Sequence, residues 1–408
     1  LTYTERGIMG QNFNSNKFDI IGFLKKAVAI GASDVHLQVD EHPAVRVDGK
    51  ILKVDMPILS EYELSYAYDE LLPAHFKGKV NSVFDLDFAY EIKGISRFRV
   101  NLSRQLGKSA LVIRTIPYNI KKVVELNLPE SIEQFATLNN GLVLVTGPTG
   151  SGKSTTIASL IDYININYPK HIITIEDPVE FIFTNKRSIV SQRQVLIDTP
   201  SFPNGIKYAL RQDPDVIFIG EIRDKETVTA ALKAAETGHL VFATIHTNDA
   251  VQTVNRIVNM FEPSDRNFVR DQLAAILRGT ISQKLIPISN GSGRRPACEV
   301  LVVTPTVKDF IQKDELEQIY ELVKKGSFNN MTTMNMSLYK LFNEGKISPS
   351  NLNSPYGLSS KATTLYLVIN STNFLRFSSG QVLPVGFWKS GITYIIFTLS
   401  VVCKTFSK

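Results

Sequence analysis

Cysteine is scarce in this sequence, and so are long apolar runs. The 408 residues include only two cysteines, Cys298 and Cys403. Two thiols exclude a framework of several disulfides and a zinc site built from four cysteines, and they fit a reducing compartment. The apolar run at residues 391–402 is shorter than the roughly 20 residues that a membrane-spanning helix needs. Residues 1–17 are polar, so we expect a disordered leader there and no signal peptide.

The sequence also has little excess charge of either sign. Its 45 basic and 39 acidic side chains give a formal net charge of +6. Residues 362–408 contain four basic residues and no acidic one, so +6 less +4 leaves +2 for everything before them. The four are Arg376, Lys389, Lys404 and Lys408. General nucleic-acid binding needs a concentrated basic face, so we expect no nucleic-acid partner.

Residues 147–155 form the most informative motif, Gly-Pro-Thr-Gly-Ser-Gly-Lys-Ser-Thr. The motif follows an apolar run, residues 141–146, and precedes a helix-like run, residues 156–166, which is the setting of a phosphate-binding loop. Its glycines let backbone N–H groups approach phosphate oxygens, and the next helix directs its positive end at the same anion. The pattern predicts ATP and Mg²⁺ as cofactors, with Lys153 at the β- and γ-phosphates and Ser154 as a magnesium ligand. The predicted nucleotide-binding residues are Gly147, Pro148, Thr149, Gly150, Ser151, Gly152, Lys153, Ser154 and Thr155.

Three further apolar runs each lead into a residue that can do chemistry. The runs are residues 172–175 before Glu176, residues 216–219 before Gly220-Glu221, and residues 240–245 before His246. Apolar strands that alternate with helical stretches predict a parallel sheet covered on both faces, with ligands beyond the carboxyl ends of the strands. We therefore expect these side chains at one site, where one carboxylate orients the attacking water and the other holds the metal. We assign the metal to Glu221 with Ser154 and a γ-phosphate sensor role to His246, against the alternatives of solvated glutamates and a structural histidine.

The first part of the chain has the sequence pattern of a small α+β domain, predicted over residues 18–117. The expected elements are helices at 18–31 and 61–75, strands at 34–39, 44–54, 83–92, 97–103 and 109–116, and a hairpin turn at Asp48-Gly49. Arg97 and Arg99 share a face of their strand because side chains alternate with a period of two, and Arg114 lies on the next strand. Alone, these arginines would be a solvated sheet face. In a ring of subunits they could reach the phosphates of a neighbour.

The remaining boundaries follow from changes of composition. We predict a linker at residues 118–140 and an α/β nucleotide-binding domain with C-terminal helices at residues 141–353. Within that domain, residues 263–350 are expected to be helical, with a polar interruption at residues 290–295. Residues 354–408 are interpreted as an atypical, non-native tail, and a membrane anchor is the alternative.

Five segments, taken in order, resemble the secretion ATPase superfamily, and within it the type IV pilus retraction ATPases that drive twitching motility. They are residues 31–37 (Gly-Ala-Ser-Asp-Val-His-Leu), residues 147–155, residues 173–181 (Ile-Thr-Ile-Glu-Asp-Pro-Val-Glu-Phe), residues 209–224 and residues 237–247. The resemblance covers about residues 18–353. It implies a RecA-like P-loop domain preceded by a smaller PAS-like domain. Its residue roles are an acidic-box glutamate at Glu176, a Walker B glutamate at Glu221, a histidine box at His239 and His246, and phosphate-facing arginines at Arg97, Arg99 and Arg114.

The resemblance also implies a function and partners. Members of the family form hexameric rings at the cytoplasmic face of the bacterial inner membrane, in which ATP turnover moves the two domains and removes pilin subunits from the pilus. The implied partners are further copies of the chain, an inner-membrane platform protein and the pilus machinery. One segment departs from the pattern: residues 306–313 read Thr-Val-Lys-Asp-Phe-Ile-Gln-Lys, where retraction members carry arginines.

Three other functions are open on the residues alone. A pilus extension or type II secretion ATPase is the nearest, although those proteins usually carry a four-cysteine metal insertion for which this sequence lacks the cysteines. A nucleic-acid translocase would use the same kind of ring, and the near-neutral body argues against it. A nucleotide-gated assembly subunit would bind ATP and hardly hydrolyse it.

Overall fold

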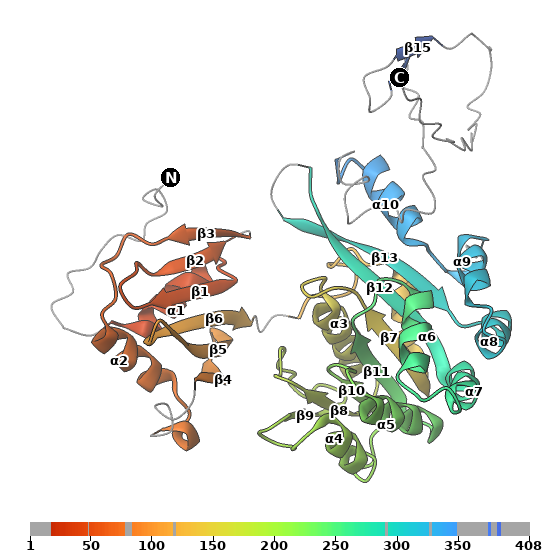
Figure 1. Cartoon of the computed structure of the whole chain (residues 1–408), viewed down its shortest axis with the longest axis horizontal. Coiled ribbons are helices and arrows are strands. Elements are labelled where there is room, and N and C mark those ends of the chain that lie inside the picture. Colours follow the sequence, from red (N-terminus) through yellow and green to blue (C-terminus); the bar gives the residue numbers. More distant parts are fainter. Residues whose placement is uncertain are drawn as a thin grey trace, which may run out of the picture. The chain divides into compact units, whose positions relative to one another are not determined.

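The fold was analysed in a computed structural model of the chain (Figure 1). The structure describes residues 18–47, 49–77, 84–116, 120–289, 293–325, 329–348, 374–376 and 382–384. The chain divides into two units, Leu1–Ser348 and Pro349–Lys408. In the second unit the described residues form an antiparallel pair of short strands, β14 (Phe374–Arg376) and β15 (Val382–Pro384). The predicted leader and the rest of the predicted tail lie outside the described residues.

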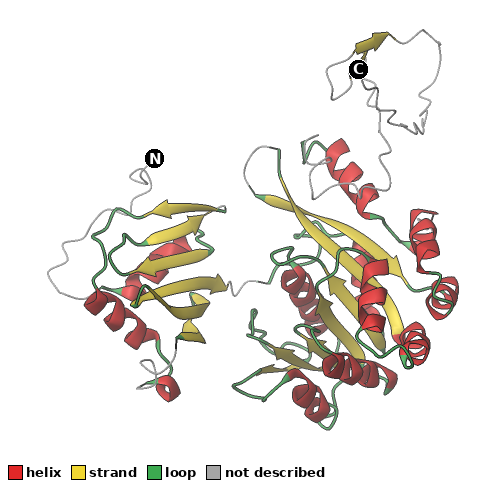
Figure 2. Ribbon diagram, viewed as in Figure 1, coloured by secondary structure: helices red, strands yellow, loops and turns green. Residues whose placement is uncertain are grey.

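The first part of unit 1 is built on six antiparallel strands in the order β3-β2-β1-β6-β5-β4 (Figure 2). These strands are β1 (Asp34–Gln38), β2 (Ala44–Val47), β3 (Lys50–Lys53), β4 (Asp85–Ile92), β5 (Ser96–Gln105) and β6 (Lys108–Ile116). The same part of the chain contains the helices α1 (Ile20–Ala29) and α2 (Glu61–Leu71) and the short 3₁₀ helix η1 (Ala74–Phe76). Both α-helices share one buried apolar cluster with the sheet, which includes Leu24, Leu64 and Phe98.

Local sequence signals explain where these elements begin and end. The predicted strand over residues 44–54 is divided into β2 and β3 at the predicted turn, where Gly49 has a φ of +81°. Helix α2 begins at a capping box in which Ser60 and Glu63 exchange hydrogen bonds. Its predicted end at residue 75 is wrong: α2 stops at Leu71, because Pro73 disfavours a helical backbone at the residue before it.

The second sheet of unit 1 has seven strands in the order β13-β12-β7-β11-β10-β8-β9. All neighbouring pairs are parallel except β12 with β13. The strands are β7 (Gly141–Thr146), β8 (His171–Glu176), β9 (Ile189–Gln194), β10 (Val216–Ile219), β11 (Leu240–Ile245), β12 (Leu277–Pro287) and β13 (Arg294–Val302). The predicted parallel α/β sheet is confirmed.

Both faces of this sheet are buried, as its apolar strands predict. On one face Val143 and Phe242 pack with α3 (Lys153–Asn167) and the 3₁₀ helix η3 (Glu130–Thr137). On the other face Leu144 belongs to a second buried cluster, to which six helices contribute. These are α4 (Phe202–Ala209), α5 (Lys225–Glu236), α6 (Ala250–Asn259), α7 (Arg266–Ile276), α8 (Pro305–Gln312) and α9 (Leu316–Lys325). Helix α10 (Met334–Asn343) contacts β13. No described helix is long and apolar enough to cross a membrane.

The prediction of a helical segment over residues 263–350 is wrong in its middle. Residues 277–287 and 294–302 form β12 and β13, which are neighbours and the two longest strands of this sheet. Tertiary pairing decides this: β12 lies parallel to β7, far away in sequence, and most of its side chains are buried there. Strand β9 also lacks a predicted counterpart. The predicted linker contains η3, whose Ile132 and Phe135 belong to the core under α3.

Candidate active site

The predicted phosphate-binding loop lies between β7 and α3, at the carboxyl edge of the parallel strands. Gly147, Gly150 and Gly152 have φ values of +142°, +77° and +89°, a region that other residues rarely adopt. Gly152 is the N-cap residue of α3, so the first N–H groups of the helix are open to an anion. Ser154 and Thr155 lie half-buried in the first turn of α3.

Lys153 extends back over this loop. Its Nζ donates hydrogen bonds to the carbonyl oxygens of Gly147 at 2.8 Å and Pro148 at 3.1 Å. The residue is only 8% exposed, and burial lowers its pKa against the opposing charges of Glu221 and Glu180. A buried ammonium that is held by neutral carbonyls is ready to exchange them for an anion.

Glu221 follows β10 and faces His246, which follows β11. The Glu221 carboxylate lies 3.2 Å from Nε2 of His246 and 2.7 Å from a terminal nitrogen of Arg223. Nδ1 of His246 lies 3.4 Å from Nζ of Lys153. Three segments that are distant in sequence therefore bring an ammonium, an imidazole and a carboxylate into one small volume.

Glu176, at the end of β8, has different surroundings. It is 5% exposed, and its carboxylate accepts hydrogen bonds from the Thr174 hydroxyl at 2.6 Å, the Gln192 amide at 3.3 Å and the backbone N–H of Glu180 at 3.4 Å. Burial raises its pKa to about 7, although these hydrogen bonds favour the ionised form. Glu176 thus holds the turn after β8, and its role as a catalytic acid or base stays a prediction.

Glu180 is a candidate site residue that the sequence reasoning missed. Its side chain is exposed, and its charge acts on Lys153, as does the charge of Glu221. The signal was present, because Glu180 is the second glutamate of Glu-Asp-Pro-Val-Glu at residues 176–180. Which of the two glutamates faces the loop depends on the path of the turn, and periodicity does not reveal that path.

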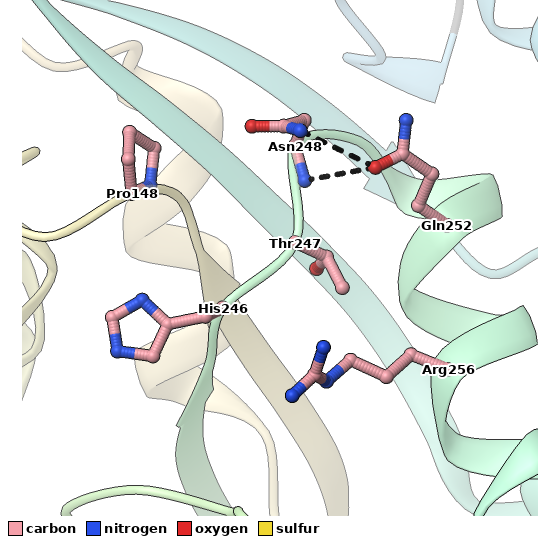
Figure 3. A pocket seen from close by; sticks show the side chains of 6 residues that line it. All are labelled: Pro148, His246, Thr247, Asn248, Gln252 and Arg256. Atoms are coloured by element: carbon pink, nitrogen blue, oxygen red, sulfur yellow. Dashed lines mark hydrogen bonds between the residues drawn. The ribbon is translucent and has the colours of Figure 1, made fainter.

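A pocket of about 400 Å³ opens beside the loop (Figure 3). Its lining residues are Pro148, His246, Thr247, Asn248, Gln252 and Arg256. Arg256 reaches from α6 toward the end of β11, where His246 lies. The side chain of Gln252 accepts hydrogen bonds from the backbone and side chain of Asn248, each at 3.4 Å. Arg256 was also missed from sequence, and it gives the pocket a positive charge.

The residues present fit a nucleotide with magnesium. Among the described residues no group of three His, Cys, Asp or Glu side chains forms a metal cage. Mg²⁺ bound to nucleotides does not need one, because phosphate oxygens and waters supply most of its ligands. The Ser154 hydroxyl and the Glu221 carboxylate, 18% exposed, are oxygen donors of the required kind.

The predicted arginines lie on the six-stranded sheet. Arg99 on β5 is directly opposite Arg114 on β6, and Arg97 shares the half-buried face of β5 with Arg99. Arg99 lies 3.7 Å from Asp87, and Nε of Arg114 lies 2.9 Å from Asp34. Burial opposes ionisation of Asp34, but hydrogen bonds from Arg114 and Ser33 outweigh it and lower its pKa.

His239 has local partners instead. Its Nδ1 lies 2.9 Å from the carbonyl oxygen of Ala234 and 3.1 Å from the Thr237 hydroxyl, where α5 ends. This is a helix-capping position.

Comparisons with known proteins agree on one family. The family model described as "Type II/IV secretion system protein" matches residues 19–343. The type IV pilus retraction ATPase PilT of Pseudomonas aeruginosa is 40% identical over 333 residues, which cover 82% of this chain and 96% of that protein. A twitching motility protein of Neisseria gonorrhoeae is 41% identical over 307 residues, 75% of this chain and 82% of that protein.

Solved structures have the same fold. A crystal structure of the pilus retraction motor PilT with bound ADP matches with a TM-score of 0.78 and 44% identity, covering 85% of this chain and 98% of that one. The ATPase DotB of Legionella pneumophila matches with a TM-score of 0.73 and 30% identity, covering 83% and 96%. The predicted resemblance to secretion ATPases is confirmed, and the chain belongs to the type II/IV secretion system protein family.

Proposed function

We propose that this chain is an ATP-hydrolysing motor that powers type IV pilus retraction and twitching motility. The observation that carries the proposal is the cluster of Lys153, His246 and Glu221 at the phosphate-binding loop. Two relatives at about 40% identity support the assignment, one named as a pilus retraction ATPase and the other as a twitching motility protein. The PilT structure with ADP supports a nucleotide as the ligand of the same fold.

The residues around the phosphate-binding loop have separate roles in this proposal. The N–H groups of the loop and the Lys153 ammonium bind the phosphates, and Ser154 and Glu221 would hold Mg²⁺, which neutralises phosphate charge when bound. Glu180 and Glu221 present carboxylates on the Lys153 side, where one of them accepts a proton from the attacking water. His246 lies between Lys153 and Glu221, so a phosphate that binds Lys153 also changes the surroundings of the Glu221 carboxylate through His246. The pocket at Arg256 lies next to these groups.

Assembly and partners belong to the same proposal. We infer a homo-hexamer with domains at residues 18–117 and 141–353, in which Arg97, Arg99 and Arg114 face the phosphates of a neighbouring subunit. The partners would be the pilus machinery and a platform protein of the inner membrane, at its cytoplasmic face. The names of the relatives support the pilus partner. The exposure of Arg114, with 63% of its side chain accessible, supports the role in trans.

A deletion and complementation experiment tests the motor function. A strain that lacks the protein should accumulate surface pili and lose twitching, and the wild-type chain should restore both. The Glu221→Gln variant should restore neither, although it assembles and binds ADP. Loss of surface pili in the deletion strain would favour an extension ATPase. Equal and negligible ATPase rates of wild type and Glu221→Gln would favour a subunit that binds nucleotide without working as a motor.

A further inference from the structure

Gln283 lies beneath the phosphate-binding loop, on a strand that the nucleotide site does not otherwise use. It belongs to β12 and is 3% exposed. Its Nε2 donates a 2.8 Å hydrogen bond to the carbonyl oxygen of Ser151, inside the loop. Its Oε1 accepts a 2.6 Å hydrogen bond from the hydroxyl of Thr156, in the first turns of α3. One buried amide therefore joins the loop to the helix that follows it.

The backbone of the loop also lies directly against β12. A Cβ atom at Gly147 would overlap the carbonyl oxygen of Gln283, and one at Gly152 would lie 2.7 Å from its Nε2. Thr146 precedes Gly147 and Ser282 precedes Gln283, and the hydroxyl of Thr146 donates to the hydroxyl of Ser282 at 2.9 Å. The two glycines are thus required by the close approach of this strand as well as by their positive φ angles.

The bond to Ser151 fixes the direction of a peptide group. A trans peptide is planar, and its C=O and N–H point in opposite directions. Because the Ser151 carbonyl is directed at Gln283, the N–H of Gly152 in the same peptide is directed away from β12. If this peptide rotated, a carbonyl oxygen would face the anion site where an N–H is needed.

We propose that Gln283 is a positioning residue for nucleotide binding, which holds the Ser151–Gly152 peptide in its anion-binding orientation and ties it to α3. The inference rests on the proposed nucleotide function and adds a residue from outside the sequence motifs to it. The interaction acts on the loop before hydrolysis begins, so its loss should weaken ground-state and transition-state binding equally. Such a change raises KM and the Kd for nucleotide and leaves kcat nearly unchanged.

The Q283E variant provides the sharpest test, because its donor depends on pH. The protonated acid keeps an O–H donor for the Ser151 carbonyl, whereas the ionised acid presents only acceptors to it. Burial raises the pKa of a carboxyl group at this position. We compare the ADP affinity of Q283E with that of wild type at the same pH, and we expect the ratio of the two affinities to be close to one at pH 5. It should fall by about 10-fold by pH 8, since a buried carbonyl is left facing a negative charge.

Two further variants complete the test, with fluorescent ADP as the probe. Q318E makes the same change at an exposed site on α9 and should bind like wild type at every pH. Q283M fills the same space without hydrogen bonds, and it should lose about 10-fold in affinity at all pH values, with kcat at saturating ATP within about twofold of wild type. It also serves if Q283E does not fold. Wild-type affinity of folded Q283M, or a pH-independent ratio for folded Q283E, would overturn the positioning role. Failure of the wild-type chain to bind ADP would instead refute the proposed function.

Discussion

The imidazole of His246 lies between the two charged groups of the site: its Nε2 is 3.2 Å from the carboxylate of Glu221, and its Nδ1 is 3.4 Å from Nζ of Lys153. Each residue stands at the end of a different parallel strand or at the start of the helix after one. The carbonyls of Gly147 and Pro148 hold Lys153 in the contacts that a phosphate would replace. A ligand that moves Lys153 must therefore change the surroundings of His246 and Glu221 as well.

Replacing Lys153 by alanine should weaken nucleotide binding by about 10- to 100-fold, because charge-assisted hydrogen bonds to phosphate are lost. The hydrogen bonds that Lys153 donates to the carbonyls of Gly147 and Pro148 are local to the loop, so the variant should stay folded. Titration with fluorescent ADP measures the loss. Lys233→Ala, at an exposed site on α5, is the matched control. Unimpaired binding by Lys153→Ala would contradict the assignment of the phosphate-binding loop.

The two glutamates of the turn after β8 should respond differently to conversion to glutamine. Glu180 is exposed and its charge acts on Lys153, so Glu180→Gln should lower ATP turnover by about 100-fold or more and leave ADP affinity intact. Glu176 is buried among Thr174, Gln192 and the Glu180 N–H, so Glu176→Gln should lower turnover by about 10-fold at most. Steady-state ATPase assays of both variants show which of the two glutamates contributes more to turnover. The opposite ranking would restore Glu176 as the acid that acts on water.

Stability should fall as the pH rises from about 5 to 8, because of two buried acids. Burial raises the pKa of Glu176 and of Glu299 to about 7, whereas the ordinary value is 4.5. Between these values the folded chain holds protons that the unfolded chain has released, so the free energy of unfolding decreases with rising pH. Below about 4.5 both states are protonated and this stability is fully present. The loss amounts to at most about 3 kcal/mol for each group.

Urea unfolding of wild type and Glu176→Gln at several pH values measures this loss. Glutamine stays neutral, so the stability of the variant relative to wild type should improve steadily from pH 5 to pH 8. Glu226→Gln changes an exposed acid on α5 and should follow the wild-type curve. Parallel curves for Glu176→Gln and wild type would show that Glu176 titrates near its ordinary value in the folded chain.

The sequence predicts the parts of the site that depend on local patterns. The loop motif stands directly between an apolar run and a helix, and strands that are apolar throughout can only belong to a sheet buried on both faces. The carboxyl ends of such strands share an edge, which is why Glu221 and His246 were expected beside Lys153. These inferences need the order of elements along the chain and no knowledge of distant contacts.

The features that were missed depend on pairing between distant segments. Strand β12 joins the sheet beside β7, and only that pairing brings Gln283 under the loop. Its alternating sequence, Leu-Arg-Gly-Thr-Ile-Ser-Gln-Lys-Leu-Ile-Pro, follows a helix directly, so no turn signal marks the change. The placement of Glu180 near Lys153 was missed for a related reason, since the path of a turn after a strand follows from its hydrogen bonds to Glu176 and Gln194.

Arg99 should act on the nucleotide of a neighbouring subunit. It stands opposite Arg114 in the sheet, and its nearest acid, Asp87, is 3.7 Å away and exposed, so the guanidinium is not committed to a buried ion pair. Arg99→Ala should lower turnover by about 1,000-fold, the lower end of the effect of an arginine supplied in trans, with ADP affinity unchanged. Arg104→Ala, on the opposite face of the same strand, is the matched control.

Mixing two inactive variants tests whether that arginine works across an interface. Lys153→Ala subunits keep Arg99 and lack a functional loop, whereas Arg99→Ala subunits keep the loop. In a mixed ring some interfaces combine an intact loop with an intact arginine, so ATP hydrolysis should reappear and reach its maximum near equal amounts of the two variants. Arg104→Ala alone should retain most of the wild-type rate. The absence of rescue at every ratio, in rings shown by native mass spectrometry to be mixed, would place the arginine and the nucleotide that it serves in the same subunit.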